Sequence, residues 1–306
     1  MKKTIYICIL FFGVVAASQA QTDPFFLQQS QNRMLINPAA TGKGGDINSA
    51  LLYRAQWIGF PGPITQSLYT NGFVKNLRSG IGLMWINDKF GPQQTNNIKL
   101  NYSYFVPFDE IAFFSLGLGV GVMNNTYNEL EYFARDLDDL VLMDLRKQNK
   151  TIPDFDFGFE FNMPQLEVGA SISHITYMYG DQSLVRPMRN IYAYSRVKLL
   201  LNKYWDFIPG ITWHNNRRLN TCEILAEFRY NNNLCVHLVY RNPLDCGIML
   251  GFNVVDGFRV AYSYDYGFDN LSRYNTGSHE FSILYNIPVN TTHMKTLLRF
   301  FRWKMF

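Results

Sequence analysis

The residue types that most often do chemistry stand in no recognisable catalytic or metal-binding spacing in this sequence. The dipeptide His279-Glu280 is not followed by the second histidine of a zinc-protease motif. The acidic run DLDDL lacks the glycine that a calcium loop needs at its sixth position, and no G-x-S-x-G nucleophile elbow occurs. We therefore expect no enzyme, no cofactor and no bound metal. The five histidines are dispersed: His174, His214, His237, His279 and His293.

The run GLGVG resembles a phosphate-binding loop only in its composition. Its glycines, Gly117, Gly119 and Gly121, alternate along a stretch with strand periodicity, so they share one face. The run does not open a helix, which a phosphate-binding loop requires. We therefore interpret it as part of a strand.

Charge and cysteine content exclude two further classes of protein. The formal net charge is only +4, which gives no electrostatic case for nucleic-acid binding. Beyond Cys8 three cysteines remain, an odd number that argues against a disulfide framework. We expect Cys222 and Cys235 to lie on opposite faces of neighbouring strands, without a bond between them.

Residues 1–20 have the organisation of a secretory signal peptide. MKK supplies a positive region, TIYICILFFGVVA an apolar region, and SQA small residues before a cleavage site at Gln21. A buried first helix is the alternative interpretation. Because Cys8 lies inside the apolar run, a lipoprotein signal is not expected. The sequence thus predicts export from the cytoplasm.

The rest of the chain alternates between apolar and polar residues with a period of two. DFDFGFEFNM, for example, places its four phenylalanines on one face and Asp156, Glu160 and Asn162 on the other. Most such segments have about nine to twelve residues, which suits a tilted strand that crosses a bilayer, whereas strands of soluble sandwiches are shorter. We count about 14 segments, at 47–57, 64–74, 79–87, 96–106, 112–123, 154–163, 165–177, 189–200, 205–214, 221–231, 234–242, 246–255, 258–267 and 278–287.

The connections between these segments alternate in length. Tight turns (KNLR, PFDE, MPQ, NK, NNN, VDG) alternate with longer links (IGFPGP, NDKFGPQQT, 124–153, MYGDQSLVRPM, NNRRLN, FDNLSRYNTG), and the short RNPLD is the exception. Short turns at one end and long loops at the other are typical of an outer-membrane barrel. A secreted β-sandwich or lectin would explain the alternation but not the strand length. We predict an all-β, transmembrane, antiparallel outer-membrane β-barrel of about 14 strands over residues 47–287, with both termini in the periplasm.

The polar face of these strands would line the lumen. Its charges balance, which favours ion pairs over a selective pore. We expect Arg54 to have a carboxylate partner across the barrel, and Trp57 to lie at the outer lipid–water interface. The predicted lumen charges are Arg54, Lys99, Arg196, Lys198, Arg229, Arg241, Arg259, Asp156, Glu160, Glu167, Glu223, Glu227, Asp265 and Glu280.

Three segments fall outside the strand pattern. Residues 21–46 are too polar to span a membrane and could enter the lumen or bind a periplasmic partner. Residues 129–147 have one apolar helical stripe, suited to packing on the barrel mouth or docking a partner. Residues 288–306 form a basic amphipathic tail, suited to a membrane surface or a partner.

Four motifs in order resemble the PorP/SprF family of type IX secretion system outer-membrane proteins. They are the opening DPFFLQQSQNRMLINPAATG, then LLYRAQWIGFPGPITQSL, then GLMWINDKFGPQQTNNIKLNYSY, and finally YSYDYGFDNLS with GSHEFSILYNI. Departures from the family pattern are the continuation past the last strand and the acidic segment near 129–147. The residues that carry the resemblance, and that we predict to contact the lumen or a partner, are Asn37, Pro38, Gly42, Arg54, Gln56, Trp57, Asn87, Asp88, Gly91, Pro92, Asp265, His279 and Glu280.

The resemblance implies a non-enzymatic outer-membrane component that works with the periplasmic ring proteins of the system. It also implies support for the export or surface anchoring of one cognate large adhesin, and for gliding in some members. Its partners would be outer-membrane lipid, the ring proteins and the secreted protein, with no nucleic acid and no small-molecule substrate. Two alternatives remain open, a passive diffusion channel and a structural anchor that ties the outer membrane to the ring through residues 21–46 or the tail.

Overall fold

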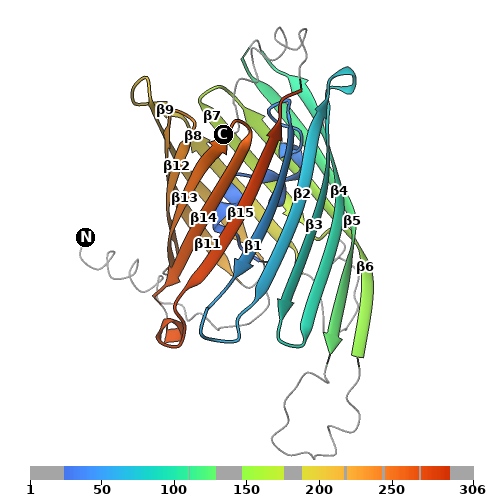
Figure 1. Ribbon diagram of the computed structural model, residues 1–306. Coiled ribbons are helices and arrows are strands. Elements are labelled where there is room, and N and C mark those ends of the chain that lie inside the picture. Colours follow the sequence, from blue (N-terminus) through green and yellow to red (C-terminus); the bar gives the residue numbers. More distant parts are fainter. Residues whose placement is uncertain are drawn as a thin grey trace, which may run out of the picture.

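The protein is a single closed barrel of antiparallel strands (Figure 1). The computed structural model describes residues 24–109, 111–128, 147–175, 188–216, 219–242, 245–268 and 270–289. The predicted segments at 1–20 and 129–146 and most of the tail lie outside these ranges. The strands are β1 (Ile47–Ala55), β2 (Ile64–Val74), β3 (Ser79–Phe90), β4 (Gln93–Pro107), β5 (Phe113–Asn128), β6 (Lys147–Asn162), β7 (Leu166–Ser173), β8 (Asn190–Val197), β9 (Leu199–Leu200), β10 (Trp205–Asn215), β11 (Asn220–Tyr230), β12 (Leu234–Arg241), β13 (Asp245–Val255), β14 (Phe258–Gly267) and β15 (Ser278–Ile287).

The ring closes because each strand pairs with the next along the chain and β15 pairs with β1. The short β9 continues β8 after a break at Lys198, and both pair with β10. Counted as one, they give a barrel of 14 strands, which confirms the predicted fold class. In the described part of the chain, no helix has the length and apolar character to cross a membrane.

Side chains alternate between the two faces as the period of two predicts. On β4, Leu100 is 61% exposed while its neighbour Lys99 is 2% exposed. Outward residues are mostly aliphatic or aromatic and would meet lipid, whereas the inward set is polar and buried. Lys198, one of the predicted lumen charges, is less buried than the others. It lies in the break between β8 and β9 and pairs with Asp206 on β10 (2.7 Å).

The two ends of the barrel differ in their connections. The upper end in Figure 1 carries the turns at 75–78, 108–112, 163–165, 201–204, 231–233 and 256–257, and we call it the periplasmic end. The lower end carries the loop after β1 at 56–63 and the ends of β5, β7 and β14, and we call it the loop end. β1 starts and β15 finishes at the periplasmic end.

The prediction of a long loop at NDKFGPQQT was wrong. β3 and β4 continue until Phe90 pairs with Gln93, so that only Gly91 and Pro92 remain in the turn. β5 and β6 likewise extend until Asn128 pairs with Lys147. These extensions are rich in Asn, Gln and Thr. Such residues pair through the backbone but do not alternate with apolar residues, so the sequence pattern ended before the strands did.

The N-terminal segment, residues 24–46, lies inside the ring of strands, where its blue turns are visible in Figure 1. It forms three short 3₁₀ turns, η1 (Leu27–Ser30), η2 (Arg33–Leu35) and η3 (Pro38–Ala40). Most of its side chains are buried, including polar ones. Such burial requires partners from the lumen wall, and these partners define the site described next.

Candidate functional site: the occupied lumen

The N-terminal segment runs along the lumen from the periplasmic end to the loop end. At the periplasmic end, the amide of Gly42 donates to Asn71 Oδ1 (3.0 Å), near the turn that follows β2. At the loop end, the Phe25 ring lies 4.0 Å from the guanidinium of Arg241, the last residue of β12. The first described residues are therefore at the loop end.

The Asn37-Pro38 turn docks against glycines of the wall. Asn37 Oδ1 accepts the amide of Ala39 (2.9 Å) and caps η3, while Nδ2 donates to the carbonyl of Phe159 (3.0 Å). A Cβ at Gly158 would lie 1.9 Å from Asn37 Oδ1, and one at Gly117 would lie 2.1 Å from the Ala39 nitrogen. These two strand glycines are therefore needed for close approach of the segment.

A second pair of glycines brings the segment against β3. Gly42 has a positive φ of 72°, and a Cβ there would lie 2.5 Å from the Gly80 Cα. A Cβ at Gly80 would in turn lie 2.0 Å from the carbonyl oxygen of Thr41. Gly42 is thus required both by its backbone conformation and by space.

A buried charge cluster fixes the periplasmic half of the segment. Lys43 pairs with Glu160 (2.7 Å) and Glu167 (2.6 Å), and Arg196 pairs with Glu167 (2.9 Å). Arg33 also approaches Glu167 (3.4 Å), and burial together with repulsion from Arg196 lowers the pKa of Arg33. Two carboxylates thus hold three cations, two of which belong to the segment, so removing either carboxylate would leave charge unpaired in the lumen.

Glu280 holds the other half of the segment at the loop end. Its carboxylate accepts the backbone amides of Leu27 (2.8 Å) and Gln28 (3.2 Å) and forms a short ion pair with Arg54. Arg54 also lies 3.6 Å from Asp265. Arg54 from the second motif and Asp265 and Glu280 from the last are therefore brought together around the start of η1.

Arg54 has the carboxylate partner that was predicted, but the prediction that this partner lies across the barrel was wrong. Arg54 and Glu280 are directly paired on the neighbouring strands β1 and β15, and Asp265 lies on β14. The N-terminal segment occupies the middle of the lumen, so side chains find partners beside them or on the segment.

Two further motif residues, Asn87 and Asp88, lie near the loop end of β3. Asp88 is on the inner face, because it is paired in register with the buried, inward Thr65, whereas Asn87 faces outward. Asn87 donates to Asn96 (2.6 Å) and Asp88 accepts from Thr65 (2.6 Å), both near the β3–β4 turn formed by Gly91 and Pro92. This part of the motif shapes the loop end of β2–β4 and does not touch the N-terminal segment in any hydrogen bond described here.

Three more motif residues flank the loop after β1 or face outward. The amide of Gln56 donates to Pro63 (2.9 Å) and closes the loop, and Trp57 follows with a positive φ of 56°. His279 lies on the outer face of β15, where its Nδ1 is 2.7 Å from the Tyr262 hydroxyl. His279 alternates with the inward Glu280 and does not line the lumen, so only the partner contact of the two predicted alternatives stays a prediction. The position of Trp57 at the lipid interface stays a prediction.

Sequence reasoning missed the contacts of Gly80, Gly117, Gly158, Lys43 and Tyr194. A signal existed for the glycines, since glycine repeated on one face of a strand marks close approach of another backbone. Tyr194 receives a hydrogen bond from Asn37 (3.0 Å) and donates one to Glu160, and nothing in its local sequence indicates either contact. The cysteine prediction was confirmed, because Cys222, Cys235 and Cys246 are all free.

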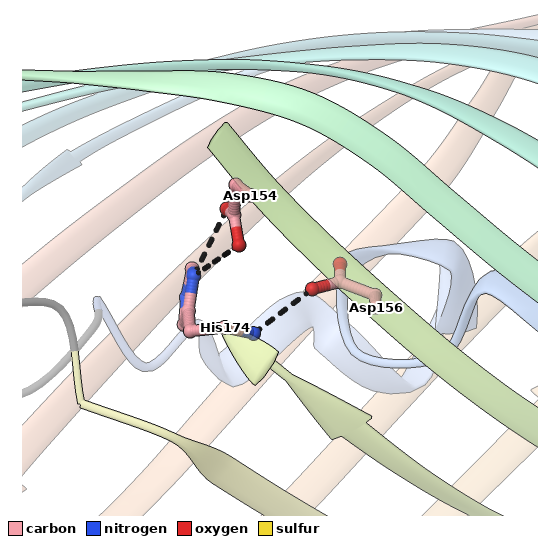
Figure 2. Close-up of side chains that lie close together, drawn as sticks. All are labelled: Asp154, Asp156 and His174. Atoms are coloured by element: carbon pink, nitrogen blue, oxygen red, sulfur yellow. Dashed lines mark hydrogen bonds and ion pairs between the residues drawn. The ribbon is translucent and has the colours of Figure 1, made fainter. Parts of the chain in front are cut away.

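Asp154, Asp156 and His174 form a second buried cluster on the inner wall (Figure 2). Their ligand atoms lie within 4.8 Å of one another, and His174 Nδ1 is 2.9 Å from Asp154. Such a set of donors could hold a divalent cation. However, the Lys99 ammonium lies 2.9 Å from Asp154 and 2.7 Å from Asp156, so the positive charge is already supplied. We assign this cluster a structural role.

The ion pair at Glu280 yields a testable prediction. Glu280→Gln should lower the free energy of unfolding by about 3–5 kcal/mol, because Arg54 would lose the closer of its two buried carboxylate partners. The urea midpoint of the purified barrel in detergent, followed by its heat-modifiable gel mobility, measures this. Arg54→Met combined with Glu280→Gln should regain part of the loss, and equal midpoints for Glu280→Gln and the wild type would contradict the assignment.

Comparison with known proteins decides the family. Residues 18–285 match the family model of the type IX secretion system membrane protein PorP/SprF. The chain belongs to this family. The PorP/SprF membership and the barrel together make the protein an outer-membrane component of the type IX secretion system.

Solved structures similar to this PorP/SprF chain are outer-membrane barrels. The Ralstonia pickettii toluene transporter TbuX is 8% identical, with a TM-score of 0.50 over 84% of this chain and 93% of its own. The Acinetobacter baumannii protein Omp33 is 8% identical, with a TM-score of 0.47 over 81% of this chain and 100% of its own. A Pseudomonas aeruginosa FadL homologue is 10% identical, with a TM-score of 0.44 over 89% and 95%. At such identities the likeness shows the fold alone. No curated protein matches the sequence.

Proposed function

We propose that this PorP/SprF protein is a non-enzymatic docking component that supports export or surface anchoring of one large secreted adhesin, and gliding where that adhesin drives it. The observation that carries the proposal is the occupied lumen. A barrel whose interior is held by about twenty of its own residues through glycine contacts and buried ion pairs is built to present surfaces, not to pass solutes.

A passive diffusion channel is the second candidate. It is favoured by the likeness to TbuX, whose name describes a toluene transporter. The N-terminal segment argues against a diffusion channel. Buried carboxylates of the barrel wall bind cations and backbone amides of the segment, so they do not line a water-filled path.

The third candidate is a structural anchor to the periplasmic ring through residues 21–46 or the tail. The occupied lumen argues against the first of these two contacts. Residues 24–45 are engaged inside the lumen and are poorly placed to bind a periplasmic protein. We propose that the periplasmic turns and the chain after Ile287 supply the contacts with the ring proteins. Residues 290–306 of this tail lie outside the described residues.

Deletion of the gene should remove one large protein from the cell surface while other secreted proteins still arrive. Surface proteomics of intact cells, shaved with protease and compared with the complemented strain, measures this outcome. If the full set of secreted proteins is displayed normally without the gene, the proposed role in export or anchoring is wrong.

A further inference from the structure

The outer face of β2–β6 is polar towards the loop end. Strand register places Gln66, Asn87, Asn96, Asn124 and Thr151 side by side in one outward row. The next row towards the loop end starts on β2 with the apolar Ile64 and continues with the polar residues Lys89, Gln94, Thr126 and Asn149.

Hydrogen bonds within the face hold these side chains in place. Asn87 donates to Asn96 (2.6 Å), and Asn124 donates to Asn149 (2.7 Å) and Thr151 (2.8 Å). The hydrogen-bonded amides and hydroxyls therefore lie on the four neighbouring strands β3–β6, at the regular strand spacing of about 4.8 Å. They form an ordered row of hydrogen-bonding groups.

This face is polar but carries little charge. Among the residues named in these two rows, only Lys89 is charged. At the loop end of β10 and β11, the described outward positions include one further polar pair, Asn215 and Asn220, whose side chains are hydrogen-bonded. On the β14–β15 side, the outward positions near the loop end are aromatic, namely Tyr262, Tyr264, His279 and Phe281.

The position of the face indicates what it meets. The outward row directly before it is apolar and contains Leu68, Trp85, Ile98 and Val122. Trp85 lies at the boundary, as expected for a membrane interface. Headgroups of the outer leaflet therefore begin where the amide and hydroxyl rows begin, and in the outer membrane of a Gram-negative cell the outer leaflet is lipopolysaccharide, whose headgroup is saccharide.

We propose that this face of β2–β6 binds the saccharide headgroup of outer-leaflet lipopolysaccharide. Sugar hydroxyls would exchange hydrogen bonds with Asn87, Asn96 and Asn124. The inference is independent of the docking role proposed above, since it concerns the lipid-side wall and not the lumen or the secreted protein.

Deacylated core oligosaccharide of lipopolysaccharide tests the proposal in titrations of the purified full-length barrel by isothermal calorimetry. The triple variant Asn87→Ala, Asn96→Ala, Asn124→Ala should bind about tenfold more weakly, because several hydrogen bonds of modest individual strength are lost. A matched control is Ser49→Ala with Thr70→Ala, which removes an outward hydrogen-bonded pair (2.8 Å) on β1 and β2 outside the face and should bind like the wild type.

The heat-modifiable gel mobility of each variant establishes that the barrel is folded. Equal oligosaccharide affinity for the triple variant and the wild type would overturn the proposal. So would full competition by inorganic phosphate, which would mean that Lys89 alone binds an anion. If the triple variant fails to fold, Asn124→Asp replaces it in the titration. This substitution keeps the size of the side chain but replaces the NH2 donor with a negatively charged oxygen, so equal oligosaccharide affinity would again overturn the proposal.

Discussion

Barrels that lack residues 24–45 should conduct ions steadily, whereas the intact protein should be closed in planar bilayers. The segment fills the lumen through Lys43, Arg33 and the turn at Asn37, and its removal would leave charged wall residues facing water. A barrel of about 14 strands lies between the filled eight-stranded type and the water-filled porins, so the emptied interior should pass small ions. Single-channel recording measures the change.

A point variant gives the control for this deletion. Gly158→Leu should push the Asn37-Pro38 turn off the wall and produce frequent openings, because a Cβ alone would approach Asn37 Oδ1 to 1.9 Å. Gln29→Ala removes one long hydrogen bond to Glu223 (3.4 Å) and should stay closed. Wild-type barrels that show the same large, steady conductance as the deletion would favour the diffusion channel and contradict the proposed function.

An epitope inserted between Asp23 and Pro24 should be labelled by antibody on intact cells. Phe25 contacts Arg241 and lies 5.7 Å from His214 by ring centroids, so the chain reaches the loop end, which faces outward. The sequence predicts that the leader is removed before Gln21, so an epitope at this position stays on the mature protein. Fluorescence of unpermeabilised cells measures this, with almost complete labelling expected.

The matched control is the same epitope placed at Asn232, in the turn between β11 and β12. That turn is at the periplasmic end and should be labelled only after the outer membrane is permeabilised. Labelling of the N-terminal epitope only after permeabilisation would show that the segment does not traverse the lumen as described.

The sequence predicted the barrel well because a period of two is a local property of each strand. The polarity of residues such as Lys99 and Leu100 predicts which face of the strand each occupies, without knowledge of the neighbouring strands. Strand ends near Phe90 and Asn128 were missed because Asn, Gln and Thr continue backbone pairing without an apolar rhythm. The sequence also indicated the ionic lumen, although the actual partner of Arg54 depends on the register of β1 with β15.

The path of the N-terminal segment could not be read from the sequence in the same way. Its 3₁₀ turns are short and have no periodicity, and its contacts join residues far apart, such as Asn37 with Phe159. Two indications were nevertheless present. The segment was recognised as too polar to span a membrane, and the glycines of GLGVG were placed on one face, which implied a neighbour for that face.

The seam between β1 and β15 constrains the order of events during biogenesis. The segment is covalently joined to β1, yet it contacts Glu160 on β6, Glu167 on β7 and Glu280 on β15, so the wall surrounds it on all sides. Threading a charged, folded segment through a finished ring would require stripping and restoring its ion pairs. Docking before the seam closes avoids that barrier, and the completed ring then traps the segment kinetically. The N-terminal segment would thus enter the lumen only during membrane insertion, before β1 pairs with β15.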